Sequence, residues 1–95
     1  MMASLSELRA AIEDVDTRLI AAIAERLALA RAVGELKVAD GEPVLDPARE
    51  AAVLARVSIL ARSAGVPEDE IRALYWRLLS MSRRAQNVAT SADGG

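Results

Sequence analysis

Apolar residues recur at alternating spacings of four and three along the first third of this 95-residue chain. The series, in which Arg26 takes one apolar position, consists of Leu8, Ile12, Val15, Leu19, Ala22, Arg26, Leu29, Val33 and Leu36. Such a seven-residue repeat is typical of a helix that packs lengthwise against other helices. No proline precedes Pro43, and Gly34 costs a helix only about 1 kcal/mol. We therefore expect one helix over about residues 5–38, opened by a capping box at Ser4–Glu7.

Two shorter helices follow a loop over residues 40–43. Asp46 and Pro47 are suited to the N-cap and first position of a helix over about 47–64, which Gly65 would end. Acidic residues at 68–70 favour a third helix over about 67–89, followed by a frayed, disordered tail over 90–95. The expected buried residues of these two helices are Val53, Leu54, Val57, Leu60, Ala64, Ile71, Leu74, Tyr75, Leu78 and Leu79. We expect an all-α fold forming one domain over residues 1–95.

The length of the first helix predicts the oligomeric state. A helix of about 34 residues is roughly 50 Å long, whereas a compact domain of this size has a radius of gyration near 12 Å. The two shorter helices are too short to cover the whole apolar series of the first. We therefore expect an intertwined helical homodimer, in which a second chain covers the remainder.

Composition excludes several classes of function. The net charge is −2 with both signs interspersed, and no basic block favours nucleic acid. The chain has no Cys and no His, so thiol chemistry, disulfides and the commonest general base and metal ligand are absent. We expect no metal and no cofactor. No apolar run approaches the roughly 20 residues that span a bilayer, and residues 1–13 lack a signal-peptide pattern. We expect a soluble, cytoplasmic protein.

Each apolar face is interrupted by polar residues, which are expensive to bury unless they are satisfied. Arg26 and Lys37 point within about 20° of each other around the first helix, roughly 16 Å apart along it, with Val33 nearly on the line between them. The other interruptions are Arg49 and Glu50 at the start of the second helix and Ser82 and Gln86 on one face of the third. A polar ligand pocket between the helices would explain all of them.

Arg9 lies about 25 Å before Arg26 on the same helix, so it cannot reach that pocket within one chain. In an antiparallel dimer it could complete the pocket of the partner. Each polar residue also has a simpler interpretation when taken alone. Arg26 could set the register of helix packing, Asp46 has a sufficient task as a cap, and the rest could be solvated charges or a fraying helix end.

Several motifs, taken in order, resemble the all-α chorismate mutases over about residues 5–88. They are the stretch LRAAIEDVDTRLIAAIAERLALARAVGELK with its Val-Gly-x-x-Lys, the stretch PVLDPARE, and the closing Ser-x-x-x-Gln. The resemblance implies an intertwined dimer of three-helix chains that rearranges chorismate to prephenate on the route to Phe and Tyr. The chain ends soon after the third helix, so we expect a stand-alone enzyme without a fused domain.

The resemblance also implies a role for each polar residue. Arg9 of the partner chain and Arg26, helped by Ser82, would hold the two substrate carboxylates, and Arg49 would belong to the same cationic lining. Lys37 and Gln86 would donate to the ether oxygen of the breaking bond. Glu50, with Asp46 nearby, would hold the ring hydroxyl, and Val33 would line the substrate site. A concerted [3,3] shift needs no nucleophile or metal, which suits a chain without His or Cys.

Three other functions remain open at this point. A lyase of the same fold would eliminate pyruvate from isochorismate, although Glu50 suits the mutase better. A mutase acting on amino-chorismate would meet a substrate that differs only where Glu50 binds, and a carboxylate can accept from an ammonium as well as from a hydroxyl. A non-catalytic dimerisation module would use the polar residues only to set register.

Overall fold

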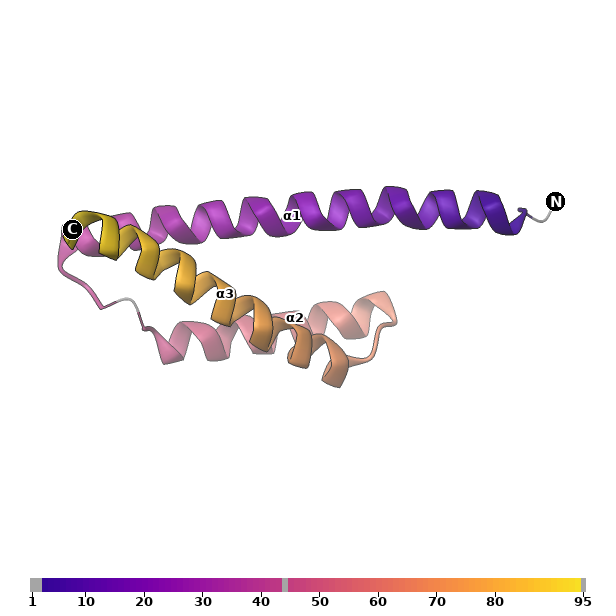
Figure 1. The fold of residues 1–95 in the computed structure, drawn as a ribbon. Helices are drawn as coiled ribbons and strands as arrows, with labels where there is room; N and C mark the ends of the chain where they lie inside the picture. Colours follow the sequence, from indigo (N-terminus) through magenta and orange to yellow (C-terminus); the bar gives the residue numbers. More distant parts are fainter. Residues whose placement is uncertain (1–2, 44, 95) are drawn as a thin grey trace.

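The computed structural model describes residues 3–43 and 45–94, with side chains described as far as Asn87. This part of the chain forms three helices and no strand: α1 (Leu5–Asp40), α2 (Pro47–Ala64) and α3 (Glu68–Gly94). The expected all-α class and the order of its helices are therefore confirmed. α3 packs against both α1 and α2, whereas within the described residues no Cα atom of α1 lies within 8 Å of a Cα atom of α2. Figure 1 shows α3 crossing between the other two helices.

The helix ends follow the expected capping chemistry. The Ser4 hydroxyl accepts from the backbone N–H of Glu7 at 3.1 Å, as the capping box predicted. α1 continues to Asp40, slightly past the predicted end, because Gly41 adopts a left-handed conformation (φ 70°) and its N–H bonds the last turn. Gly65 ends α2 in the same way at φ 72°.

The third helix is longer than the sequence predicted. α3 runs to Gly94, so the predicted end near residue 89 and the predicted tail from residue 90 are wrong up to that point; Gly95 lies outside the described residues. No glycine or proline occurs between Glu68 and Asp93, so nothing in this stretch blocks the helical hydrogen bonds.

The single chain is extended rather than globular. Its principal extents are 58 × 26 × 15 Å and its radius of gyration is 17.0 Å, compared with about 12 Å for a compact chain of this length. In Figure 1 the N-terminal end of α1 projects beyond α2 and α3. No helix in the described residues is both long enough and apolar enough to cross a bilayer.

The core is small, and the side chains that α1 and α2 contribute to it are short. Its buried residues are Ala30 and Gly34 on α1, Val57, Ser58 and Ala61 on α2, and Leu78, Leu79 and Ser82 on α3. Two residues that were predicted to be buried are not: Leu60 is 49% exposed and Leu74 is 54% exposed. Ala64 is also exposed. The contact face of α2 is turned toward Ser58 and Ala61, whose small side chains let α3 approach closely.

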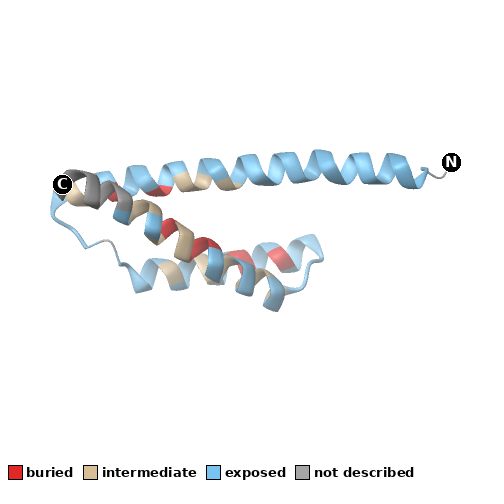
Figure 2. Ribbon diagram, in the orientation of Figure 1, coloured by how far each residue is buried: buried red, intermediate tan, exposed pale blue. Residues whose placement is uncertain are grey.

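The repeating apolar series of α1 is not covered within one chain. Its members Leu8, Ile12, Val15 and Leu19 are all exposed, and so are Leu29 and Leu36 beside α3. α1 meets α3 through Ala30 and Gly34, which lie beside the series rather than on it. Figure 2 shows the N-terminal half of α1 exposed throughout.

Candidate functional site

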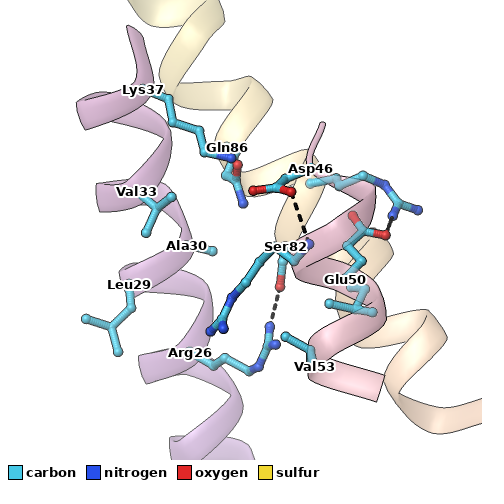
Figure 3. A pocket seen from close by; sticks show the side chains of 13 residues that line it. Arg26, Leu29, Ala30, Val33, Lys37, Asp46, Glu50, Val53, Ser82 and Gln86 are labelled. Carbon is cyan, nitrogen blue, oxygen red and sulfur yellow. Dashed lines mark hydrogen bonds and ion pairs between the residues drawn. The ribbon is translucent and has the colours of Figure 1, made fainter. Parts of the chain in front are cut away.

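A pocket of about 460 Å³ lies between the three helices. Its lining residues are Arg26, Leu29, Ala30, Val33 and Lys37 from α1; Asp46, Arg49, Glu50 and Val53 from the start of α2; and Leu79, Ser82, Arg83 and Gln86 from α3. Every polar residue that the sequence placed in the pocket is present except Arg9. Figure 3 shows these side chains converging from helices that are far apart in the sequence.

Arg26 is held in place from two sides. Its Nη1 donates to the Ser82 hydroxyl at 2.5 Å, and that hydroxyl donates to the backbone carbonyl of Leu78 at 2.9 Å. The guanidinium carbon also lies 5.7 Å from the centre of the Tyr75 ring, within range of a cation–π interaction. Ser82 is buried, so its bond to Arg26 is sheltered from water. The cation is thus oriented before any ligand binds.

Lys37 and Gln86 lie together at the other end of the pocket. Their side chains point toward each other from α1 and α3 (Figure 3). The two helices meet here because Gly34 has no side chain: a Cβ at that position would lie 2.8 Å from the Gln86 Cα and 2.9 Å from its carbonyl oxygen. Gly34 is about one turn before Lys37, so the close contact sets the distance between the Lys37 and Gln86 backbones.

Glu50 carries an ion pair that the sequence analysis missed. Arg83 on α3 donates from Nη1 to the Glu50 Oε1 at 2.5 Å, and the two side chains are 32% and 17% exposed. A sequence signal for Arg83 did exist, because it precedes Gln86 by three residues and such residues share a helix face. The pairing with Glu50 had no such signal, since the two residues are 33 positions apart.

Asp46 and Arg49 help to form the start of α2 and also line the pocket. Asp46 Oδ1 accepts from the backbone N–H of Arg49 at 3.0 Å, so the predicted N-cap of α2 is confirmed. The cap fixes the first turn of α2, from which the side chains of Arg49 and Glu50 reach the pocket.

Arg9 lies outside this pocket in the single chain. It lines a separate shallow depression near the start of α1, together with Leu5, Ser6, Ala10 and Glu13. This separation was expected, because Arg9 lies about 25 Å before Arg26 along the same helix.

The charges of the pocket suit a small dianion. Four cations and two carboxylates line it, giving a net charge of +2. Apolar walls lower the local dielectric constant and so strengthen the electrostatic interactions between these charges and a ligand. The wall residues are Leu29, Ala30, Val33, Val53 and Leu79, of which only Val33 was named for the site beforehand. No group of three or more Asp and Glu side chains that could hold a metal ion occurs among the described residues.

Comparisons with known proteins agree with this arrangement. Over 87 residues the chain is 39% identical to the T-protein of Enterobacter agglomerans, covering 92% of this chain and 23% of that protein. It is 35% identical over 86 residues to the T-protein of Haemophilus influenzae, again spanning 23% of the relative. It is 36% identical over 69 residues to the chorismate mutase of Methanocaldococcus jannaschii, covering 73% of this chain and 70% of that one.

A family model described as chorismate mutase type II matches residues 8–87. The match includes all of α2, most of α1 and α3, and every lining residue of the pocket. The chain belongs to the chorismate mutase type II family.

Proposed function

We propose that this chain catalyses the intramolecular rearrangement of chorismate to prephenate. The observation that carries the proposal is the pocket of net charge +2 in a chain of the chorismate mutase type II family. Chorismate is a dianion, so its two carboxylates match this charge. The cytoplasmic location expected from the sequence stays a prediction.

Substrate binding would begin with Arg26. An arginine can bind a carboxylate through two parallel hydrogen bonds, and Ser82 already orients the Arg26 guanidinium at 2.5 Å. Arg49 would add a second cation on the α2 side of the pocket. Holding a flexible substrate in a chair-like geometry removes much of the entropy that the reaction would otherwise lose at the transition state.

Catalysis would come from Lys37 and Gln86. As the C–O bond breaks, negative charge grows on the ether oxygen, and hydrogen-bond donors fixed in a water-poor site stabilise that charge. The Lys37 ammonium and the Gln86 amide both line the pocket, and the Gly34 contact fixes the separation of their backbones. No covalent intermediate is required, which suits a site built without His or Cys.

We further propose that a second copy of the chain covers the exposed series of α1 and brings its Arg9 to the pocket. Burying a large apolar side chain stabilises an assembly by about 1.5–3 kcal/mol, and Leu8, Ile12, Val15 and Leu19 are all available. In an antiparallel pair, the start of one α1 lies beside the end of the other. Arg9 would then supply a further cation for the second substrate carboxylate.

The direct test is to incubate the purified protein with chorismate and to follow the loss of its absorbance and the formation of prephenate. We expect acceleration by the wild-type protein. The kcat of the Lys37→Ala variant should be lower than that of the wild type by a factor of about 10²–10³. Removing one such donor has an effect of this size at comparable sites. Arg31→Ala is a suitable control, because Arg31 is exposed, does not line the pocket and pairs with Glu35 on the same helix.

The outcomes separate the alternatives. Products formed from isochorismate but not from chorismate would indicate the lyase. A folded dimer that accelerates neither reaction would contradict the proposed function and favour a non-catalytic dimerisation module. A Lys37→Ala variant with wild-type turnover would show that the ether oxygen is not stabilised by Lys37.

A further inference from the structure

We propose that Arg83 determines specificity at the ring substituent of the substrate: by pairing with Glu50 it makes the pocket select a hydroxyl over an ammonium. The inference rests on the proposed function and deepens it. It concerns the position at which chorismate and amino-chorismate differ. Arg83 acts through Glu50 and is therefore a positioning residue.

The ion pair between Arg83 and Glu50 joins two helices across the pocket. Arg83 comes from α3 and Glu50 from the first turn of α2, and their charged atoms lie 2.5 Å apart. Both residues line the same cavity as Lys37 and Gln86. The Glu50 side chain is only 17% exposed, so its charge is little screened by water. Arg83 is thus the cation that pairs directly with the Glu50 carboxylate.

A hydroxyl and an ammonium make different demands on that carboxylate. A hydroxyl needs only an acceptor, and a carboxylate has about four acceptor sites, so Glu50 can pair with Arg83 and accept another hydrogen bond. An ammonium needs a net negative charge to replace its lost hydration. Beside a carboxylate that is already neutralised, the ammonium meets the repulsion of Arg83 instead. The pair thus retains hydroxyl binding and disfavours the cationic group.

The charge of the whole pocket acts in the same direction. With Arg83 the lining carries four cations and two carboxylates, a net charge of +2 that matches a dianion. An ammonium on the ring lowers the net charge of the ligand to −1. Removing Arg83 lowers the charge of the pocket to +1 and leaves Glu50 without its cation. Both changes favour the amino substrate relative to chorismate.

The test compares kcat/KM for chorismate with kcat/KM for amino-chorismate in four proteins. They are the wild type, Arg83→Met, Arg83→Lys and Arg84→Met. We expect Arg83→Met to lower the ratio of chorismate to amino-chorismate by about tenfold or more, equal to about 1.4 kcal/mol. Arg83→Lys keeps the positive charge and should keep the preference. Arg84→Met is the matched control, because Arg84 is exposed, bonds Ser80 and does not line the pocket.

A double-mutant cycle shows whether Arg83 acts through Glu50. In a Glu50→Gln background, the Arg83→Met substitution should change the ratio much less than it does in the wild type, because only the smaller contribution of the overall pocket charge remains. The dissociation constants of chorismate and amino-chorismate are compared in the same way. They are measured by calorimetry in a Lys37→Ala background, where slow turnover leaves both compounds intact. Circular dichroism and light scattering confirm that each variant keeps its helices and oligomeric state.

Each result decides one of the two proposals. An unchanged ratio in Arg83→Met, or a shift of undiminished size in the Glu50→Gln background, overturns the role of Arg83 while leaving the proposed function intact. A wild-type protein that neither binds nor converts either compound overturns the proposed function and this inference with it. A wild-type protein that converts both compounds but prefers the amino substrate overturns this inference and favours the amino-chorismate mutase over the proposed function.

Discussion

Gly34 and Gln86 lie closer together than any other residue type at position 34 would allow. A Cβ on Gly34 would overlap the Gln86 backbone at 2.8 Å, and backbone atoms cannot turn aside as a flexible side chain can. In isolated helices glycine is worse than alanine by about 1 kcal/mol. The close contact therefore explains why a glycine in the middle of α1 is favourable for the site.

From this contact we expect Gly34→Ala to lower activity although it raises helix propensity. Overpacking of this kind costs about 1–3 kcal/mol, and relief by moving α3 would displace Gln86 from the position that we propose for it beside the ether oxygen. The expected result is a fall in kcat of at least about tenfold in chorismate turnover. Glu35→Ala, at the exposed neighbouring position, should have little effect. Wild-type kcat in Gly34→Ala would show that the spacing of α1 and α3 does not matter.

Ser82 provides a second prediction at this scale. Ser82→Ala removes the acceptor that orients Arg26 and leaves the guanidinium without its buried partner. Losing a hydrogen bond to a charged group costs about 1.5–3 kcal/mol. We expect KM for chorismate to rise by about tenfold or more, with a smaller change in kcat. Ser80→Ala is the matched control, since Ser80 accepts from the exposed Arg84. Equal KM values for the two variants would contradict the orienting role of Ser82.

Sequence reasoning found the residues that interrupt an apolar pattern and missed those that do not. Arg26 and Ser82 stand where an apolar residue is expected, so each was visible in the sequence, and the structure brings both to one pocket. Arg83 sits beside the apolar stripe of its helix, where a cation is ordinary. Its importance follows from a contact between helices, and spacing along one helix carries no information about such contacts.

At the scale of secondary-structure elements, α1 carries two different faces. Ala30 and Gly34 contact α3. The apolar residues of the series that begins with Leu8 and Ile12 and repeats every seven positions lie on another face and stay exposed. The sequence predicted a lengthwise packing face but could not tell a face used within the chain from one left for a partner. It also placed Leu60 in the core, because periodicity gives a face only to within about one residue of rotation.

The exposed face of α1 yields a prediction about assembly. Ile12 is 59% exposed in the single chain and belongs to the series that we assign to the dimer. Ile12→Lys should therefore weaken the dimer, because a charge buried in an apolar seam is costly. We expect light scattering to show dissociation at protein concentrations where the wild type is dimeric. Ala21→Lys adds the same charge on the opposite side of α1 and should leave the dimer intact. Equal behaviour of the two variants would contradict the assigned interface.

At the scale of the whole molecule, the extended shape of the single chain supports the proposed dimer. Its 58 Å length and 17.0 Å radius of gyration arise from the half of α1 that α2 and α3 do not cover. That same half carries Arg9, which the single chain keeps away from the pocket. One event, the antiparallel docking of a second copy, would bury the apolar series and complete the cationic lining.

The most direct measurement is chorismate turnover by mixed dimers of Arg9→Ala and Lys37→Ala chains, refolded together. If Arg9 acts across the interface, one site of each mixed dimer contains Lys37 from the Arg9→Ala chain and Arg9 from the Lys37→Ala chain. Random pairing then restores about a quarter of wild-type activity, because half of the dimers are mixed and each has one intact site. Each variant refolded alone should stay nearly inactive. If the mixture stays as inactive as the separate variants, the shared site, and with it the central claim, is contradicted.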